Sequence, residues 1–349
     1  MRTDTEVLII GGGQAGLACA QALAGRGIAS LILDAGKEPG ESWRSRYDSL
    51  KLFTPRGLSA LPGLELSGAP EGFPSKDELA GYLADYAQHF GLSLESGRRV
   101  QTLRRQGDGF EAVTAGGVYT ARRVIAAAGA FGEPSVPDFA MKLSPSVVQL
   151  HSASYRSPAQ LPPGPALVVG SGNSGAQIAA ELAGDRPVLL ASRHPVRFLP
   201  LTFLGRSTFG WMIRLGLLSA PRESILGRAM RRRPDPIFGL ELRELVREGR
   251  VRWKPGAVDG AGERVVFADG SEERPSSVVW ATGFRPDYSW LAVDGALDPQ
   301  GRPLHDRGVS PAAGLYYAGL PWQHTRGSAL LCGAGRDAAY LAERIAAGL

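Results

Sequence analysis

An apolar run that leads into a glycine-rich turn constrains the fold of this chain more than any other feature. Residues 6–10 (Glu-Val-Leu-Ile-Ile) are typical of a buried parallel strand, and residues 11–16 (Gly-Gly-Gly-Gln-Ala-Gly) follow directly. Residues 17–24 then favour a helix. Strand, glycine turn and helix in this order predict a dinucleotide-binding unit, in which a pyrophosphate binds at the helix N-terminus. A glycine turn that only packs tightly is the alternative interpretation.

The residues of this turn have distinct tasks in such a unit. Gly11 permits the tight turn, Gly13 lets the pyrophosphate approach bare backbone, and Gly16 lets the helix pack close to the strand. A second strand over residues 29–33 ends in Asp34, an acid that can accept hydrogen bonds from ribose hydroxyls. The residues expected at the first nucleotide are Gly11, Gly13, Gln14, Ala15, Gly16 and Asp34.

The same design recurs in the second half of the chain. Residues 166–169 predict a strand, residues 170–175 (Gly-Ser-Gly-Asn-Ser-Gly) repeat the turn, and residues 176–183 favour a helix. Arg193 follows Gly170 at the same spacing as Asp34 follows Gly11. An acid suits a free ribose 2′-hydroxyl and an arginine suits a 2′-phosphate, so we predict FAD at the first turn and NADPH at the second. The residues expected at the second nucleotide are Gly170, Gly172, Asn173, Ser174, Gly175, Ser192 and Arg193.

Length and composition exclude several other classes of protein. A chain of 349 residues favours two domains, and its net charge of +5 suits an anionic ligand without indicating nucleic acid. Cys19 and Cys332 lie far apart in predicted helices, which excludes a disulfide framework and fits a cytoplasmic location. We recognise no signal peptide, no metal-ligand cluster and no apolar run of the ~20 residues that an integral membrane segment needs.

Weaker patterns order the rest of the chain. Residues 75–78 form a capping box that starts a helix with a core-facing aromatic stripe, and residues 98–119 predict a small antiparallel meander. Residues 132–165 are interpreted as a proline-rich linker. The expected closing elements are strands over residues 124–129, 278–284 and 315–319, and a helix over residues 328–346.

Residues 43–52 (Trp-Arg-Ser-Arg-Tyr-Asp-Ser-Leu-Lys-Leu) are too polar for a core element, and here the chain resembles a known family. The run is similar to the class B flavoprotein monooxygenases, above all to their small bacterial and plant branch. That resemblance covers nearly the whole chain, and an ordered surface loop is the alternative. It implies that Trp43, Arg44, Leu52 and Thr54 line the flavin, that Val100 meets the adenine, and that the segments ending at Gly129, Gly283 and Gly319 close the nucleotide sites.

The fingerprint of that family is only partly present. Of its F-x-G-x-x-x-H-x-x-x-(Y or W) pattern, His151 and Tyr155 remain, while Pro145 and Val147 replace the phenylalanine and the glycine. The tyrosine ending resembles the heteroatom-oxidising branch. We interpret His151 as a residue that positions the two domains. A counterpart of the asparagine that many relatives place beside flavin C4a was not recognised, and no catalytic side chain is assigned.

The fold class that follows is α/β, with two Rossmann-like dinucleotide-binding domains arranged as in disulfide oxidoreductases. The FAD domain is expected over residues 1–158 and 286–349, with the NADPH domain inserted at residues 159–285. Dithiol chemistry is not expected, because no cysteine pair is present. We therefore expect NADPH to reduce FAD, O2 to add at C4a, and the hydroperoxyflavin to oxygenate sulfur or nitrogen of a small molecule. An NADPH oxidase that releases H2O2 and a non-catalytic redox sensor are the alternatives.

Residues 199–233 are the segment whose role is least determined. Their broken amphipathic pattern allows a lid over the substrate, a homodimer surface or a membrane-surface helix. The triplet Arg231–Arg233 is interpreted as the solvated end of a helix, since no aromatic interleaving supports nucleic-acid binding.

Overall fold

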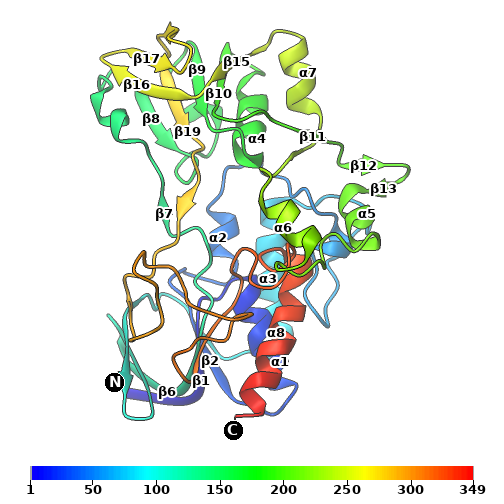
Figure 1. Cartoon of the computed structure of the whole chain (residues 1–349), viewed down its shortest axis with the longest axis vertical. Coiled ribbons are helices and arrows are strands. Elements are labelled where there is room, and N and C mark those ends of the chain that lie inside the picture. The colour runs from blue at the N-terminus through cyan, green and yellow to red at the C-terminus, as the bar shows by residue number, and fades with distance from the viewer. Residues whose placement is uncertain (1, 349) are drawn as a thin grey trace.

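The computed structural model describes residues 2–348 and has two main sheets, one above the other in Figure 1. The first sheet has the order β21-β4-β5-β6-β1-β2-β3, and β22 also pairs with β6. Its strands are β1 (Arg2–Ile10), β2 (Ser30–Leu33), β3 (Leu94–Glu95), β4 (Val100–Gln106), β5 (Gly109–Thr114), β6 (Gly117–Ala126), β21 (Leu291–Ala292) and β22 (Leu315–Tyr317). The fold class predicted from the two glycine turns is confirmed.

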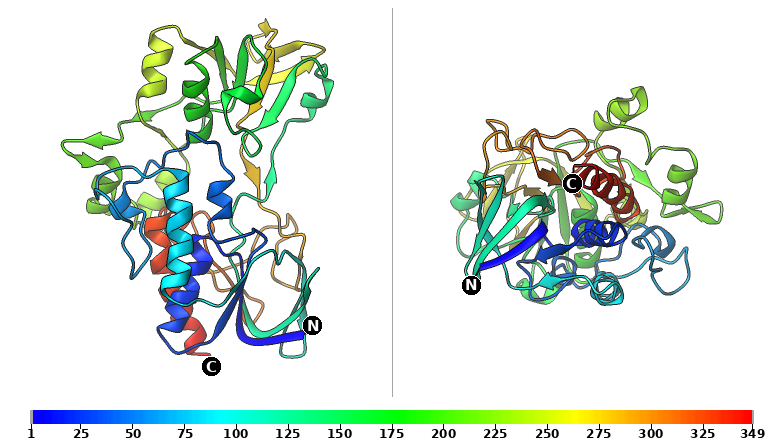
Figure 2. Two further views of the ribbon diagram at one scale, coloured as in Figure 1. Left: turned by 180° about the vertical axis from the view of Figure 1, so that it is seen from behind. Right: turned by 90° about the horizontal axis from the view of Figure 1, so that it is seen from below.

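Strand β1 has buried residues on both faces of the sheet, because successive side chains of a strand point to opposite faces. Val7 and Ile9 face a core formed with α1 (Gln14–Ala24), α3 (Lys76–His89) and α8 (Leu331–Ala346). These three helices lie side by side along the sheet in Figures 1 and 2. Leu8 and Ile10 face a second core, formed with the meander β4–β6 and the segment before β22. The capping box is confirmed, since Ser75 and Glu78 exchange both bonds at the start of α3.

The end of the meander differs from the prediction. The end of the meander predicted over residues 98–119 and the closing strand expected at residues 124–129 belong to one strand, β6, which pairs antiparallel with β5 and parallel with β1. The polar pair Arg122 and Arg123 obscured this continuity, because these two charged residues, one exposed and one half-buried, interrupt the middle of a largely buried strand. The first sheet is therefore mixed, with the meander continuing directly into the parallel part of the sheet.

The second sheet is parallel, with the order β15-β10-β9-β19-β8. Its strands are β8 (Val148–His151), β9 (Ala166–Val169), β10 (Val188–Ser192), β15 (Val251–Pro255) and β19 (Ser277–Trp280). Helices α4 (Asn173–Leu182) and α7 (Glu241–Arg247) cover one face. The other face carries a 3-10 turn at Asp138–Lys142 and the sheet of β16 (Ala257–Ala261), β17 (Arg264–Phe267) and β18 (Glu272–Glu273). The interpretation of residues 132–165 as a plain linker is wrong in part, because β8 pairs with β19.

The chain crosses between the two sheets on a pair of short strands. Strand β7 (Glu133–Pro134) leads out of the first sheet and β20 (Phe284–Arg285) leads back, and the two pair antiparallel with Glu133 opposite Arg285. Figure 1 shows this crossing as the narrow connection between the upper and lower parts. The expected strand over residues 278–284 is thus divided between β19 in the second sheet and β20 in the crossing.

The segment that follows β10 leaves the second sheet and packs against the first unit. It contains β11 (Phe198–Leu199), β12 (Thr202–Phe203), β13 (Arg206–Ser207), α5 (Thr208–Arg214), α6 (Ile225–Arg231) and β14 (Ile237–Phe238). Phe209, Met212 and Leu218 are buried here against Phe53 and Leu330. Within residues 2–348, no helix is long and apolar enough to cross a membrane, and no cluster of His, Cys, Asp or Glu could hold a metal ion.

Candidate functional site

The first glycine turn has the backbone geometry of a phosphate cradle. Gly11 has a φ of +113°, and its N–H donates to the carbonyl of Leu33 (2.8 Å). A Cβ at Gly11 would lie 2.3 Å from the Ala127 carbonyl oxygen, and a Cβ at Gly16 would lie 1.9 Å from the Gly11 carbonyl oxygen, so both positions need glycine. At Gly13, the N-cap of α1, no described atom lies within 4 Å of the Cβ position. The space in front of the helix N-terminus is therefore open to a phosphate.

The second glycine turn repeats this geometry at the end of β9. Gly170 has a φ of +109°, and its N–H donates to the carbonyl of Ala191 (2.9 Å). A Cβ at Gly170 would lie 2.3 Å from the Ala281 carbonyl oxygen, and one at Gly175 would lie 2.0 Å from the Gly170 carbonyl oxygen. Gly172 caps α4 and again meets no atom of residues 2–348 within 4 Å of its Cβ position. Both turns thus have the same geometry, and each fits the phosphates of a dinucleotide.

The first turn holds its acid in a fixed place. Asp34 follows β2, and its carboxylate accepts hydrogen bonds from the N–H groups of Gly12 and Gly36, the latter at 2.7 Å. Each carboxylate oxygen takes one of these bonds, and each oxygen has a further lone pair for a ribose hydroxyl. The backbone N–H of Arg98 donates to the Asp34 carbonyl (2.7 Å), so the residues just before β4 also lie at this point.

The second turn has hydroxyls and an arginine in the corresponding places. Ser192 donates to the His194 carbonyl (2.7 Å) and its oxygen also contacts the Ser171 hydroxyl, so the Ser192 hydroxyl supports the turn itself. Arg193 is exposed, and a Cβ at Gly256 would lie 2.7 Å from the Arg193 Cγ, which shows that its aliphatic stem lies close to that glycine. The charge contrast between Asp34 and Arg193 is therefore present at matched positions of the two turns.

The loop that resembles the monooxygenases lies beside the first turn. Trp43, in α2 (Glu41–Arg44), donates its indole N–H to the Gln14 side chain (3.1 Å), and Gln14 donates to the Ala329 carbonyl (3.4 Å). This chain of bonds connects the loop, the start of α1 and the residues before α8. Arg44 forms an ion pair with Glu38 (Nε to Oε1, 2.7 Å). Contact of Trp43 and Arg44 with a flavin stays a prediction.

The other residues implied by the resemblance fall on two sides of the first sheet. Leu52 is buried in the core that includes α1 and α8, and the buried hydroxyl of Thr54 contacts that of Ser59 (2.7 Å). Val100 is buried on the opposite face, at the start of β4 and near the Asp34 end of the turn. Leu52 and Thr54 thus lie together, and Val100 lies apart from them, as an extended dinucleotide would require of its two ends.

Three glycines with positive φ follow the closing strands. Gly129 follows β6 with a φ of +77°, Gly283 follows β19 with +83°, and Gly319 follows β22 with +79°. A Cβ at Gly319 would lie 2.8 Å from the Cβ of Ala15, so this glycine lets the third strand end directly against the start of α1. Each of the three therefore lies at the edge of a sheet where a nucleotide is expected.

An arginine between the two closing strands was not identified from the sequence. The Arg46 guanidinium lies 4.6 Å from the ring centroid of Phe131 and 5.0 Å from that of Phe284. These phenylalanines lie just after Gly129 and Gly283, so Arg46 contacts the segments that follow β6 and β19. Burial lowers the pKa of Arg46. No local pattern marks this arrangement, since the three residues are far apart in the chain.

His151 lies at the same junction. Its Nδ1 accepts the Ala153 N–H (3.1 Å), which leaves Nε2 to donate to the Gly283 carbonyl (3.0 Å), and its ring meets that of Phe284 edge-on. Burial lowers the pKa of His151, with a further contribution from the positive charge of Arg46. Both ring nitrogens have partners in the protein, and this geometry supports the positioning role predicted for His151.

Two tyrosines join the monooxygenase-like loop to the second unit. Tyr155 is fully buried and donates to Glu181 (2.7 Å), while Tyr47 donates to Gln177 on α4 (3.0 Å) and also lies beside Ser174. Asn173 does not present its amide to the open turn: its side-chain oxygen accepts the Phe238 N–H (2.8 Å), which fastens β14 to α4. Ser174 and Asn173 thus have partners in the protein, a feature that the glycine spacing could not reveal.

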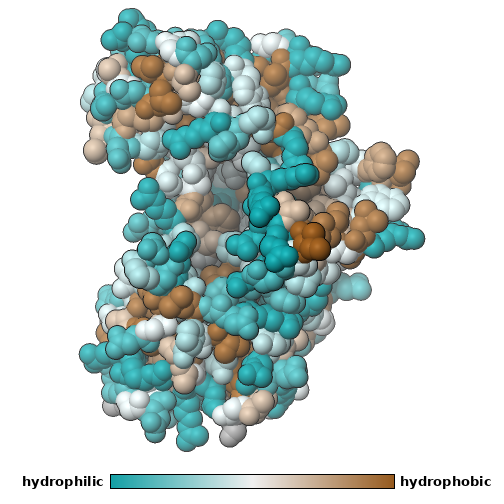
Figure 3. Space-filling model, in the orientation of Figure 1, coloured by the Kyte–Doolittle hydropathy of each residue, from teal (hydrophilic) through white to brown (hydrophobic). Residues whose placement is uncertain are grey.

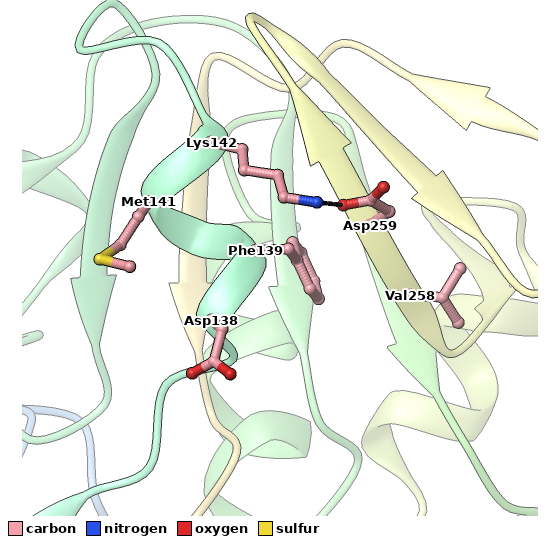
Figure 4. Close-up of a pocket in the computed structure, with 6 residues that line it drawn as sticks. All are labelled: Asp138, Phe139, Met141, Lys142, Val258 and Asp259. Carbon is pink, nitrogen blue, oxygen red and sulfur yellow. Dashed lines mark hydrogen bonds and ion pairs between the residues drawn. The ribbon is translucent and has the colours of Figure 1, made fainter.

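A groove elsewhere on the second unit has none of these features. Figure 4 shows it between the 3-10 turn at Asp138–Lys142 and β16, with Lys142 and Asp259 joined by an ion pair (2.8 Å). Met141 and Val258 point outward at its margin. None of the residues predicted for either nucleotide lines this groove.

Comparison with known proteins gives one consistent result. The model of the family "Pyridine nucleotide-disulphide oxidoreductase" matches residues 8–196. The "Uncharacterized oxidoreductase CzcO-like" of Geobacillus kaustophilus is 47% identical and covers 98% of both chains, and the "Indole-3-pyruvate monooxygenase YUCCA6" of Arabidopsis thaliana is 30% identical over 98% of this chain and 90% of its own.

Two solved structures place the fold more closely. The flavin-containing monooxygenase from Stenotrophomonas maltophilia aligns with a TM-score of 0.82 at 29% identity, over 99% of each chain. The bacillithiol disulfide reductase from Staphylococcus aureus aligns with a TM-score of 0.74 at 17% identity over 99% of each chain, which is a likeness of fold alone.

Proposed function

The chain belongs to the pyridine nucleotide-disulphide oxidoreductase family, as a flavoprotein of the class B monooxygenase type, and we propose that it oxygenates sulfur or nitrogen in small molecules. It is an oxidoreductase that depends on FAD and NADPH. The proposal includes the small-molecule substrate, its sulfur or nitrogen atom as the site of oxygenation, and the route through flavin C4a that is expected from the sequence. The observation that carries it is the pair of matched glycine turns with Asp34 at one and Arg193 at the other.

The domain assignment is part of the same proposal. Residues 1–158 and 286–349 would hold FAD, and residues 159–285 would hold NADPH. Strand β8 lies before the limit at residue 158 yet pairs with β19, so its four residues belong with the second sheet in this assignment.

Each part of the chain has a distinct task when the cofactors are bound. FAD supplies the redox and oxygen chemistry. The protein has to bind and orient the cofactors and the substrate, and it has to exclude water from the site. Gly13 and Gly172 leave backbone open to the two sets of phosphates, and Arg193 would pair with a 2′-phosphate. Trp43 and Gln14 would fix the flavin side of the loop.

The surroundings of this loop favour an apolar substrate. Phe53 lies between Leu52 and Thr54 in the chain. Its ring stacks on that of Phe209 (5.4 Å between centroids) and on that of Phe238 (5.1 Å). Such an aromatic cluster keeps water from the adjoining space and suits a thioether or an aromatic amine. Cys19 and Cys332 are both free thiols, and burial raises the pKa of each, to about 12 for Cys19, so the described residues offer no reactive dithiol.

The test is the stoichiometry of NADPH, O2 and product. Purified enzyme is mixed with NADPH under air and a panel of thioethers, amines, indoles, ketones and indole-3-pyruvate, while H2O2 is measured in parallel. We expect a thioether or amine to raise NADPH consumption, to suppress H2O2 and to appear as its oxide. Equal amounts of NADPH and H2O2 with every compound would favour the oxidase, and no NADPH consumption would favour the sensor.

A further inference from the structure

The positive charge of this protein is concentrated in one segment, residues 199–233. The segment contains one acid, Glu223, and seven arginines, which are Arg206, Arg214, Arg222, Arg228, Arg231, Arg232 and Arg233. Its net charge is therefore +6, while the whole chain has +5, so the remaining residues together carry −1. Six of these arginines are exposed, and Arg222 is half-buried beside Glu223.

The same segment gathers exposed apolar side chains. Six of the eleven large apolar side chains that are exposed within residues 2–348 lie here: Phe203, Leu204, Ile213, Leu215, Ile225 and Leu226. Leu204 is 77% exposed and Ile225 is 83% exposed. Figure 3 shows brown side chains from α6 out to the β12–β13 hairpin, with teal side chains between and around them. Exposed apolar side chains that cluster among charged residues mark an interaction surface.

The apolar tip of the hairpin is held away from the protein. Leu204 and Gly205 form its two-residue turn with φ values of +48° and +71°, and a leucine in this region is strained. The Trp211 indole N–H donates to the Phe203 carbonyl (2.8 Å), which braces the hairpin from α5. Strain of this kind persists at functional positions because the surroundings enforce it.

The inner face of the segment is already satisfied. Phe209, Met212 and Leu218 are buried against Phe53 and Leu330, and Arg336 bonds Ser219 (2.9 Å). The segment is therefore anchored, so its exposed apolar side chains do not face a vacant core that a closing lid would fill. They need a partner outside this chain.

We propose that residues 199–233 dock on the surface of an anionic lipid bilayer. The hairpin tip and α6 would enter the boundary between headgroups and acyl chains, and the arginines would lie against lipid phosphates. A second copy of the chain fits less well, because this face would bring two clusters of like charge together. No membrane-spanning element is needed, since the contact is interfacial.

The experiment is vesicle flotation with FAD-loaded enzyme. Phosphatidylcholine vesicles are compared with vesicles that also contain phosphatidylglycerol, at low and high salt. We expect flotation only with phosphatidylglycerol, weakened by salt. One basic residue near an anionic surface contributes about fivefold in partitioning, so Arg231→Gln, Arg232→Gln and Arg233→Gln together should weaken binding by about a hundredfold. Phe203→Ser with Leu204→Ser should weaken binding on its own.

Matched variants use the same chemistry elsewhere on the surface. Met141→Ser with Val258→Ser removes exposed apolar side chains, and Arg243→Gln with Arg264→Gln removes exposed charge; both pairs should float as wild type does. FAD content and thermal unfolding verify that each variant is folded.

Three results would overturn the proposal. The first is a wild-type protein that does not float with anionic vesicles, and the second is flotation that both sets of variants leave unchanged. The third is light scattering that finds a dimer which Phe203→Ser with Leu204→Ser converts to a monomer, with vesicle binding unaltered. That last result would assign the face to a second copy of the chain.

Discussion

The hydroxyl of Tyr47 donates a 3.0 Å hydrogen bond to the side-chain oxygen of Gln177, which lies on the helix that begins at the second glycine turn. The same Gln177 donates to the Lys51 carbonyl (3.0 Å). One side chain of the second unit therefore holds both ends of the loop over residues 47–51, which belongs to the first. The parts of the chain that carry the two glycine turns are connected through this contact as well as through the β7–β20 crossing.

Replacing Gln177 by leucine should loosen this connection. The variant loses hydrogen bonds at both ends of the loop, so the free energy of unfolding should fall by about 1–2 kcal/mol. FAD content should stay normal, because the first turn is untouched, while turnover with NADPH should fall. Denaturant unfolding, flavin absorbance and steady-state rates measure the three effects. Gln88→Leu, at an exposed position of α3, is the control. An unchanged turnover rate in Gln177→Leu would show that the contact has no part in positioning the units.

Alanine at the two open glycines should separate the cofactors. No described atom lies within 4 Å of a Cβ at Gly13 or at Gly172, so both variants should fold normally. The added methyl group occupies the space of a phosphate in each turn. We expect Gly13→Ala to be purified with little FAD, and Gly172→Ala to keep its FAD but show a KM for NADPH raised about tenfold or more. The opposite pattern would exchange the assignment of the two turns.

Gly16→Ala is the informative contrast to Gly13→Ala. Its Cβ would lie 1.9 Å from the carbonyl oxygen of Gly11, so the strand and helix must separate. We expect poor folding, seen as a lower yield of folded protein and a lower unfolding temperature. A stable Gly16→Ala protein would contradict the packing role of this glycine.

The pH dependence of stability should report on His151. Burial lowers the pKa of His151 in the folded protein, so the unfolded chain, with a pKa of about 6.5, binds a proton that the folded chain does not. Stability is therefore complete above pH ~6.5 and falls as the pH decreases toward the folded-state pKa. The pKa values of His305 and His324 are lowered by burial too, so they contribute in the same direction.

The variant His151→Gln keeps a donor for the Gly283 carbonyl but has no proton to gain. Its free energy of unfolding should therefore fall less steeply with acid than that of the wild type, with the remaining slope due to the other histidines. Denaturant titrations on both sides of pH 6.5 measure this difference. Identical slopes would show that protonation of His151 does not differ between the folded and unfolded states.

The sequence reveals local features of this protein better than its long-range contacts. The glycine turns were predictable because Gly11 and Gly170 have a positive φ, which favours glycine over other residues. The capping box was predictable because its two members, Ser75 and Glu78, are three residues apart in the sequence. The place of Arg46 between two phenylalanines was not, since Phe131 and Phe284 are separated from it by long stretches of chain. The same holds for β8, whose pairing depends on a strand more than a hundred residues later.

The choice between NADPH and NADH should depend on Arg193. This exposed side chain follows β10 where a 2′-phosphate is expected, and a hydrogen bond to a charged group contributes about 1.5–3 kcal/mol, or roughly one to two decades in affinity. Arg193→Ala should raise the KM for NADPH by about tenfold or more and leave that for NADH nearly unchanged, since NADH has no phosphate to lose. Ser192→Ala should act differently, because the Ser192 hydroxyl supports the turn and its loss should affect both cofactors.

Arg243→Ala is the matched control for Arg193→Ala, since Arg243 is an exposed arginine of the same unit, on α7 and away from the turn. Steady-state kinetics with both cofactors should find it equal to the wild type. A wild-type enzyme that uses NADH and NADPH equally well, together with an Arg193→Ala variant that changes neither, would refute the assignment of Arg193 to the phosphate. The two glycine turns would still predict two nucleotides, because the close backbone contacts at Gly11, Gly16, Gly170 and Gly175 do not depend on Arg193.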